Sequence, residues 1–89
     1  MNDILSETDV RAIEQILVRE LEIKPDQLTA DARFEEDFSA DSLTMAEIML
    51  GIEDHFDLSV PEEHWERVKT VGQLYETVVE ILQQRGRCR

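Results

Sequence analysis

Residues Asp37–Phe56 read DFSADSLTMAEIMLGIEDHF, and this stretch decides the predicted fold. No Pro interrupts it from Ser42 onward, and apolar side chains recur there at the spacing of one helix face. That face is about 100° wide, the width of a stripe buried against a core. It comprises Met45, Ile48, Met49, Ile52 and Phe56. The stretch therefore predicts a helix over Ser42–Phe56 with Asp41 as its N-cap.

A second apolar strip follows the other side of this helix and consists of Leu43, Ala46 and Leu50. Acidic residues surround it, namely Glu47, Asp54 and Asp57. A helix with one buried stripe does not need a second one. The strip either packs beneath another element or forms a small apolar patch that contacts a partner. We favour the partner surface, because the surrounding carboxylates must stay solvated.

Length and charge narrow the class of protein. A chain of 89 residues makes one small domain, and its hydrophobic share of 42% is ordinary for a folded chain. The net charge is −12, from 21 acids against 9 bases. Such a surface repels nucleic acid and anionic lipid and attracts basic protein surfaces. The alternative, that the acids only keep a small domain soluble, remains open on composition alone.

Other chemistry finds little support in the sequence. Cys88 is the only cysteine, which argues against a disulfide-stapled domain and for a reducing compartment. His55 and His64 lack the spacing of metal ligands, and the alternating Asp37, Ser39 and Asp41 lack the Gly and Glu of a calcium loop. We therefore expect no metal site. With no apolar run long enough to span a membrane, we expect a cytoplasmic, monomeric protein.

The remaining chain predicts three further helices. The first, over Glu7–Glu22, follows a Ser6 cap and ends before Pro25. A short helix is predicted from Pro61 to Arg67, and a last one over Val71–Gln84 begins with the capping box of Thr70 and Gln73. Between the first two helices lies a long connection, residues 24–40, with room for one helical turn near Phe34–Asp37.

These elements predict an all-α fold, a small bundle of three main helices plus one short helix with a long first connection. The predicted domain covers residues 1–84. Residues 85–89 hold three arginines and no acid, so we expect a basic flexible tail there.

The chain resembles the acyl carrier protein family from the first predicted helix through the last. Asp41-Ser42-Leu43 matches the attachment motif of that family. Phe34-x-x-Asp37-Phe38 before it, and Glu47 and Ile52-Glu53-Asp54-His55-Phe56 after it, match the segments that flank the motif in the family. Further matches are Val60-Pro61-Glu62-Glu63 and Lys69-Thr70-Val71-Gly72. The resemblance implies a carrier without catalytic activity of its own.

The resemblance also implies which residues act. Ser42 would bear 4′-phosphopantetheine as a phosphodiester, where the amino end of a helix favours negative charge. Asp41 would cap the helix and present Ser42 to the modifying enzyme. Without the resemblance, Ser42 reads as an N-terminal helix residue with a capping role. An acyl cavity would be lined by Phe34, Met49, Ile52, Val60, Trp65, Val68 and Leu74.

The implied partners are a holo-carrier synthase (a phosphopantetheinyl transferase) and enzymes that load, transfer or condense acyl groups through basic docking surfaces. The residues implied to contact them are Leu43, Glu47, Leu50, Glu53 and Asp54. For each acid the alternative is a solvated helix face. The cargo would belong to fatty-acid, lipid or polyketide-type biosynthesis. A carrier of aminoacyl groups, and an unmodified acidic interaction module of the same fold, remain alternatives.

Three positions depart from the family pattern. Ser39 stands where the family usually has Gly, and it would be strained if the backbone there needs a positive φ. Thr44 replaces an acid that is often found two residues after the attachment Ser. Trp65 replaces a small cavity residue and would fill or reshape that cavity.

Overall fold

The computed structural model describes residues 5–87 and contains five α-helices in that range. They are α1 (Glu7–Leu21), α2 (Phe34–Phe38), α3 (Ser42–Phe56), α4 (Glu62–Trp65) and α5 (Val71–Arg87), with a 3₁₀ turn, η1, at Pro25–Gln27. Within these residues the only β-type pairing is an isolated bridge between Arg33 and Thr70. The prediction of a small all-α fold is therefore confirmed.

The capping signals read from the sequence act as expected. Ser6 Oγ accepts a hydrogen bond from the Asp9 backbone N–H at 3.1 Å, and Asp9 Oδ2 accepts one from the Ser6 N–H at 3.2 Å. This reciprocal pair begins α1. At α5, Thr70 Oγ1 and the Gln73 side chain form the same arrangement. Side-chain caps thus fix where α1 and α5 begin.

The long connection is bonded to the start of α5. The Gly72 N–H donates to the Ala30 carbonyl at 2.8 Å, and the Phe34 N–H donates to the Lys69 carbonyl at 3.0 Å. A Cβ on Gly72 would lie 2.9 Å from the Ala30 oxygen, so this close approach requires glycine. These bonds hold α2 beside the segment that leads into α5.

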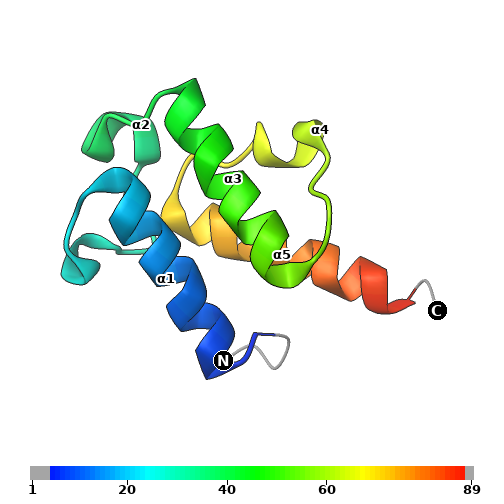
Figure 1. Cartoon of the computed structure of the whole chain (residues 1–89). Coiled ribbons are helices and arrows are strands. Elements are labelled where there is room, and N and C mark those ends of the chain that lie inside the picture. The colour runs from blue at the N-terminus through cyan, green and yellow to red at the C-terminus, as the bar shows by residue number, and fades with distance from the viewer. Residues whose placement is uncertain (1–4, 88–89) are drawn as a thin grey trace.

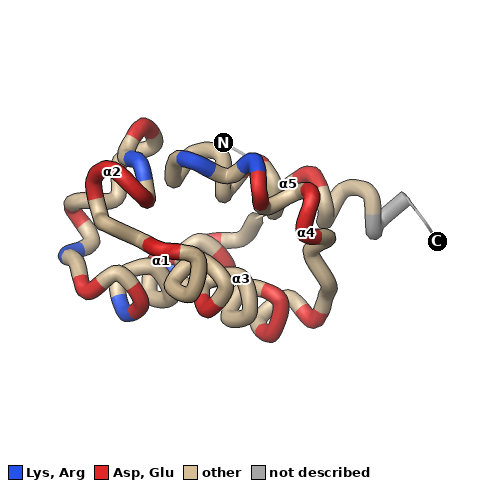
Figure 2. The backbone as a smooth tube through the Cα atoms, turned by 90° about the horizontal axis from the view of Figure 1, so that it is seen from above, with Lys and Arg blue, Asp and Glu red and all other residues tan. Residues whose placement is uncertain are grey.

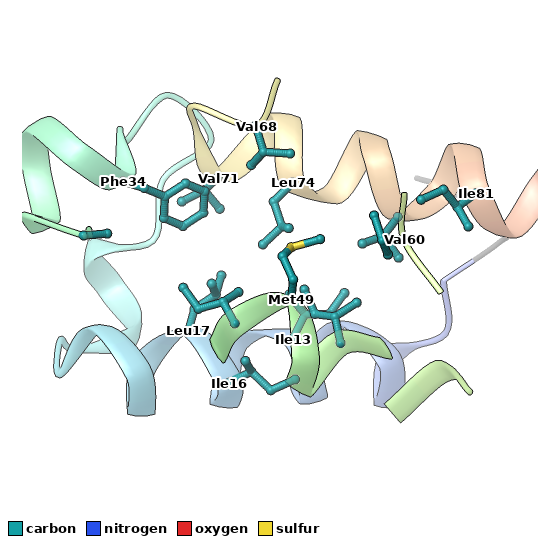
Figure 3. Packing of buried hydrophobic residues seen from close by; sticks show 14 of the residues in the cluster. Ile13, Ile16, Leu17, Phe34, Met49, Val60, Val68, Val71, Leu74 and Ile81 are labelled. Carbon is teal, nitrogen blue, oxygen red and sulfur yellow. The ribbon is translucent and has the colours of Figure 1, made fainter. Parts of the chain in front are cut away.

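The three long helices enclose one core (Figure 1). Helices α1 and α3 lie side by side, α5 crosses behind α3, and the short α2 and α4 flank the first half of α3. Sixteen apolar residues are buried: Leu5, Ile13, Ile16, Leu17, Ala32, Phe34, Ala40, Ile48, Met49, Ile52, Val60, Val68, Val71, Leu74, Val78 and Ile81. No polar or charged residue is buried in the described part of the chain. In Figure 3, Met49 points from α3 towards Leu74 and Val68.

Two helix ends differ from the prediction by two residues or more. Helix α4 ends at Trp65 rather than Arg67, because its last residues fold into tight turns in which Arg67 and Val68 donate to the carbonyls of His64 and Trp65. Helix α5 continues to Arg87, beyond the predicted end near Gln84. A Gly in a helix costs only about 1 kcal/mol, which is too little to stop α5 at Gly86. Residues 85–87 are thus helical, and the rest of the expected tail lies outside the described residues.

No helix in the part of the chain that the structure describes is both long and apolar enough to cross a membrane.

Candidate functional site

Ser42 lies at the first residue of α3, directly after a tight turn from α2. Helix α2 ends at Phe38, and Ser39 takes the left-handed conformation with φ 56° and ψ 33°. The Ala40 N–H then donates to the Phe34 carbonyl at 3.0 Å, and the Ala40 side chain is buried. The turn is therefore fixed at both ends and holds Ser42 at the surface.

Asp41 caps α3, and Ser42 does not. Asp41 Oδ1 accepts a hydrogen bond from the Thr44 backbone N–H at 2.9 Å. This bond lowers the pKa of the Asp41 carboxyl below its usual value, since it favours the charged form. The Ser42 side chain is exposed, and within the described residues its hydroxyl makes no hydrogen bond. The capping role considered for Ser42 thus belongs to its neighbour, and the Ser42 hydroxyl is open to solvent.

Replacing Ser39 with Gly should stabilise the fold. A residue with a Cβ is disfavoured in the left-handed region by roughly 1–2 kcal/mol, while Gly gains freedom in the unfolded chain. We expect Ser39→Gly to gain about 1 kcal/mol and to raise the melting temperature by about 4–8 °C. Ser39→Ala, which removes the hydroxyl but keeps the Cβ, is the control and should give no rise in a thermal melt. Equal melting temperatures for the Gly and Ala variants would contradict strain at Ser39.

A groove opens beside Ser42 between α2, α4 and the segment that enters α5. We call it the Ser42 groove; its volume is about 630 Å³. Its lining residues are Arg33, Phe34, Glu35, Glu36, Ala40, Asp41, Ser42, Met45, Glu62, Trp65, Glu66, Val68, Lys69, Thr70 and Gln73. The residues predicted to line an acyl cavity fall into two groups. Phe34, Trp65 and Val68 line this groove, whereas Met49, Ile52, Val60 and Leu74 lie in the core and do not.

Charged residues from separate elements meet around the groove. Acids come from α2, from the N-cap of α3 and from α4 and its C-cap, and the bases are Arg33 and Lys69. Arg33 forms an ion pair with Glu36, with 2.6 Å between Nη1 and Oε1. Figure 2 shows the acids spread along α2, α3 and α4 and the few bases between them. Sequence reasoning did not predict this cluster of charges, because it depends on backbone contacts between residues 30–34 and 69–72, which are distant in the sequence.

The outer side of α3 carries an exposed apolar pair. Leu43 is 67% exposed and Leu50 is 62% exposed, and they are the exposed large apolar residues of the described chain. Glu47 and Asp54 are exposed on the same helix. We call Leu43, Glu47, Leu50 and Asp54 the partner face. No other element in the described residues covers the two leucines, so they are not part of the buried core.

Glu53 differs from the other predicted contact residues. Its side chain is partly buried, and Oε2 accepts a hydrogen bond from the Val60 backbone N–H at 2.7 Å. This bond ties the end of α3 to the loop before α4. A partner that bound the Glu53 carboxylate would have to compete with it. The sequence offers little indication of this hydrogen bond, because nothing in the local pattern distinguishes Glu53 from Asp54.

Both histidines lie beside acids of other helices. His55 Nε2 is 3.2 Å from Asp9 Oδ1, and His64 Nδ1 is 3.8 Å from Glu80 Oε1. Burial raises the pKa of Asp9, but hydrogen bonds from Ser6 and His55 outweigh it, so the pKa is lowered overall. Across residues 5–87, no three His, Cys, Asp or Glu side chains gather in a group that could hold a metal ion.

The chain is similar to known proteins over most of its length. The family model described as "Phosphopantetheine attachment site" matches residues 11–78, a span that contains Ser42. An acyl carrier protein of Bdellovibrio bacteriovorus is 36% identical over 75 residues, covering 84% of this chain and 91% of that protein. One from Akkermansia muciniphila is 36% identical over 81 residues, covering 91% and 98%. One from Sulfurovum is 35% identical over 60 residues, covering 67% and 80%.

Proposed function

Because this chain belongs to the acyl carrier protein family, we propose that Ser42 is the residue that carries its 4′-phosphopantetheine. That group is the cofactor of the family, and carrier proteins have no catalytic activity of their own. One observation carries the assignment to Ser42. Its exposed hydroxyl stands at the amino end of α3 within the motif Asp41-Ser42-Leu43 and is not used as a helix cap.

The residues around Ser42 fit a phosphodiester. Amide N–H groups of a helix's first turn point towards its amino end and favour an anion there. Ser42 Oγ would bond to the phosphorus while the link from that phosphorus to the nucleotide of coenzyme A breaks, and the hydroxyl proton would pass to a base of the transferase. When bound, the cofactor supplies a thiol that holds an acyl group as a thioester. Asp41 keeps the first turn of α3 in place throughout.

We propose that the partner face docks on the enzymes that modify and use the carrier. These would be a phosphopantetheinyl transferase and acyl-loading, transferring or condensing enzymes of fatty-acid, lipid or polyketide-type biosynthesis, acting on a cytoplasmic monomer. Two features support this proposal. The exposed Leu43 and Leu50 offer apolar contact, and Glu47 and Asp54 offer attraction to basic surfaces.

Intact mass after incubation with coenzyme A and a phosphopantetheinyl transferase tests the carrier function. We expect one addition with the mass of the arm. A chain that gains no mass, with a verified carrier modified in the same reaction, would instead act as an unmodified interaction module.

Reversing charge on the partner face should slow docking. We expect Glu47→Lys and Asp54→Lys each to lower the association rate with the transferase, because opposite charges steer encounter. The difference from the unsubstituted chain should shrink as salt rises, since exposed charges are screened over about 8–10 Å at physiological ionic strength. Stopped-flow or surface-binding kinetics at several salt concentrations measure the association rate and its dependence on salt.

Glu76→Lys is the matched control, because it makes the same charge change on an exposed acid of α5. It should leave the association rate close to that of the unsubstituted chain. Equal slowing by all three substitutions would mean that net charge, and not the partner face, governs docking.

A further inference from the structure

Glu53 accepts hydrogen bonds from three backbone N–H groups of the loop between α3 and α4. Its main-chain carbonyl accepts one from Asp57 and another, at 3.1 Å, from Leu58. Its side chain accepts one from Val60, with 2.7 Å between the Val60 nitrogen and Oε2. Every residue has a main-chain carbonyl, so only the bond from Val60 requires the Glu53 side chain. That bond is short and its acceptor is a carboxylate, which places it among the stronger hydrogen bonds of a protein.

The Val60 anchor matters because α4 has few anchors of its own. Helix α4 has four residues, no side-chain cap and no buried residue, and its Trp65 is only partly buried against the core. Val60 before the helix and Val68 after it are 6% and 5% exposed. The bond to Glu53 satisfies the N–H of Val60, which is partly buried together with its side chain. The amino end of α4 is therefore held through Val60.

The position of α4 in turn shapes the surroundings of Ser42. Glu62, Trp65 and Glu66, from α4 and its C-cap, line the Ser42 groove together with Ser42 itself. An enzyme that reaches the Ser42 hydroxyl therefore meets α4 as well. Glu53 lies eleven residues further along α3, about 16 Å away at the rise of an α-helix, and does not line the groove. It acts on this region only through the loop and α4.

Asp54, the next residue, lies in the opposite setting. Its side chain is exposed and, in the part of the chain that the structure describes, makes no hydrogen bond or ion pair. A basic side chain of a partner can approach Asp54 without breaking any bond of the fold. The same basic side chain would bind the Glu53 carboxylate only in competition with the Val60 N–H. These two adjacent acids therefore differ in what they can offer a partner.

We infer that Glu53 is a positioning residue, which holds α4 at the Ser42 groove through Val60 and takes no part in docking on basic partners. This role differs from the partner contact that the family resemblance implies for Glu53. The hold on α4 rests on the geometry of this chain alone. The statement about docking rests also on the proposed partner face, and the two are tested by separate measurements.

Amide hydrogen exchange of the unsubstituted chain, followed residue by residue by NMR, tests the hold on α4. Ser59 is exposed, and its N–H makes no hydrogen bond in the described structure. We expect the Val60 amide to exchange at least about tenfold more slowly than the Ser59 amide, relative to their intrinsic rates, because its bond to a charged acceptor must first open. Equal exchange at the two positions would overturn the inference, and this result needs no variant.

Glu53→Ala should loosen α4 and leave the rest of the bundle in place. The Val60 amide should lose its protection, while the amide of Ile48 in the middle of α3 keeps its own. The emission of Trp65, the only tryptophan in the chain, should shift to the red as α4 moves away from the core. An equal loss of protection at Val60 and Ile48 would mean that Glu53 supports the whole fold and not α4, which would contradict the proposed role.

Glu53→Gln separates the hydrogen bond from the charge. A Gln side chain has the same length and keeps an oxygen that accepts from Val60, but it is neutral. This variant should retain more of the Val60 protection than Glu53→Ala does. It should also associate with the phosphopantetheinyl transferase at nearly the rate of the unsubstituted chain. Asp54→Asn makes the same change on the neighbouring exposed acid and should slow association clearly more.

Equal slowing by Glu53→Gln and Asp54→Asn would overturn the statement that Glu53 takes no part in docking. If both variants instead associate at the full rate, the partner face and not Glu53 has failed. The exchange of the Val60 amide needs no partner, so it decides the hold on α4 in either case.

Discussion

Ser42→Ala should abolish loading with 4′-phosphopantetheine and leave the fold intact. The substitution removes an exposed hydroxyl that makes no hydrogen bond in the described structure, and Ala is the best helix former. The cap of α3 stays in place, because Asp41 provides it. We expect a stability change within about 0.5 kcal/mol and no mass addition. Circular dichroism melts and intact mass after the transferase reaction measure the two effects.

Ser39→Ala and Ser59→Ala are the controls for this result. Both remove an exposed serine hydroxyl near an end of α3, and neither residue lies in the attachment motif. Both variants should gain the mass of one arm. A Ser42→Ala chain that still gains this mass would show that another residue is modified.

Phe34→Ala should have the largest effect on stability of the substitutions considered. The Phe34 ring is 2% exposed and joins α2 to the core, and its backbone bonds to Lys69 and Ala40 fix the turn before Ser42. Removing a buried ring costs about 3–5 kcal/mol, through lost apolar burial and the cavity left behind. Urea unfolding with Trp65 emission measures the free energy of unfolding directly.

Phe38→Ala provides the comparison at the other end of α2. Its ring lies 6.4 Å from that of Phe34, measured between centroids, but the residue is only partly buried. The loss should therefore be clearly smaller than for Phe34→Ala. Equal losses at the two positions would mean that α2 is held by the contact between the two rings and not by burial of Phe34.

Much of the fold could be predicted because each main helix carries its own start signal. The Ser6 and Thr70 capping boxes and the Asp41 cap are local, so a few consecutive residues determine them. The strain expected at Ser39 is also local. Its positive φ follows from the need to end α2 and begin α3 within three residues. Ser42 could be identified for the same reason, because it lies at a helix start that the neighbouring residues determine.

The features that could not be predicted depend on contacts between residues of different structural elements. Glu53 and Asp54 look alike in the sequence, but only Glu53 bonds to the Val60 N–H seven residues later. The groove requires the pairing of Arg33 with Thr70, which no periodicity reveals. Whether Trp65 points inward or lies on the outer face of its short helix also depends on packing between helices. The structure gives it part of both settings, against the core and along the groove.

The most direct measurement is a peptide map of the unsubstituted chain after reaction with coenzyme A and a phosphopantetheinyl transferase. Tandem mass spectrometry then locates the added mass within the sequence. Our assignment predicts a single 4′-phosphopantetheine on Ser42, with Ser39 and Ser59 unmodified. An arm on any other residue, or no arm when a verified carrier is modified in the same reaction, would contradict the assignment.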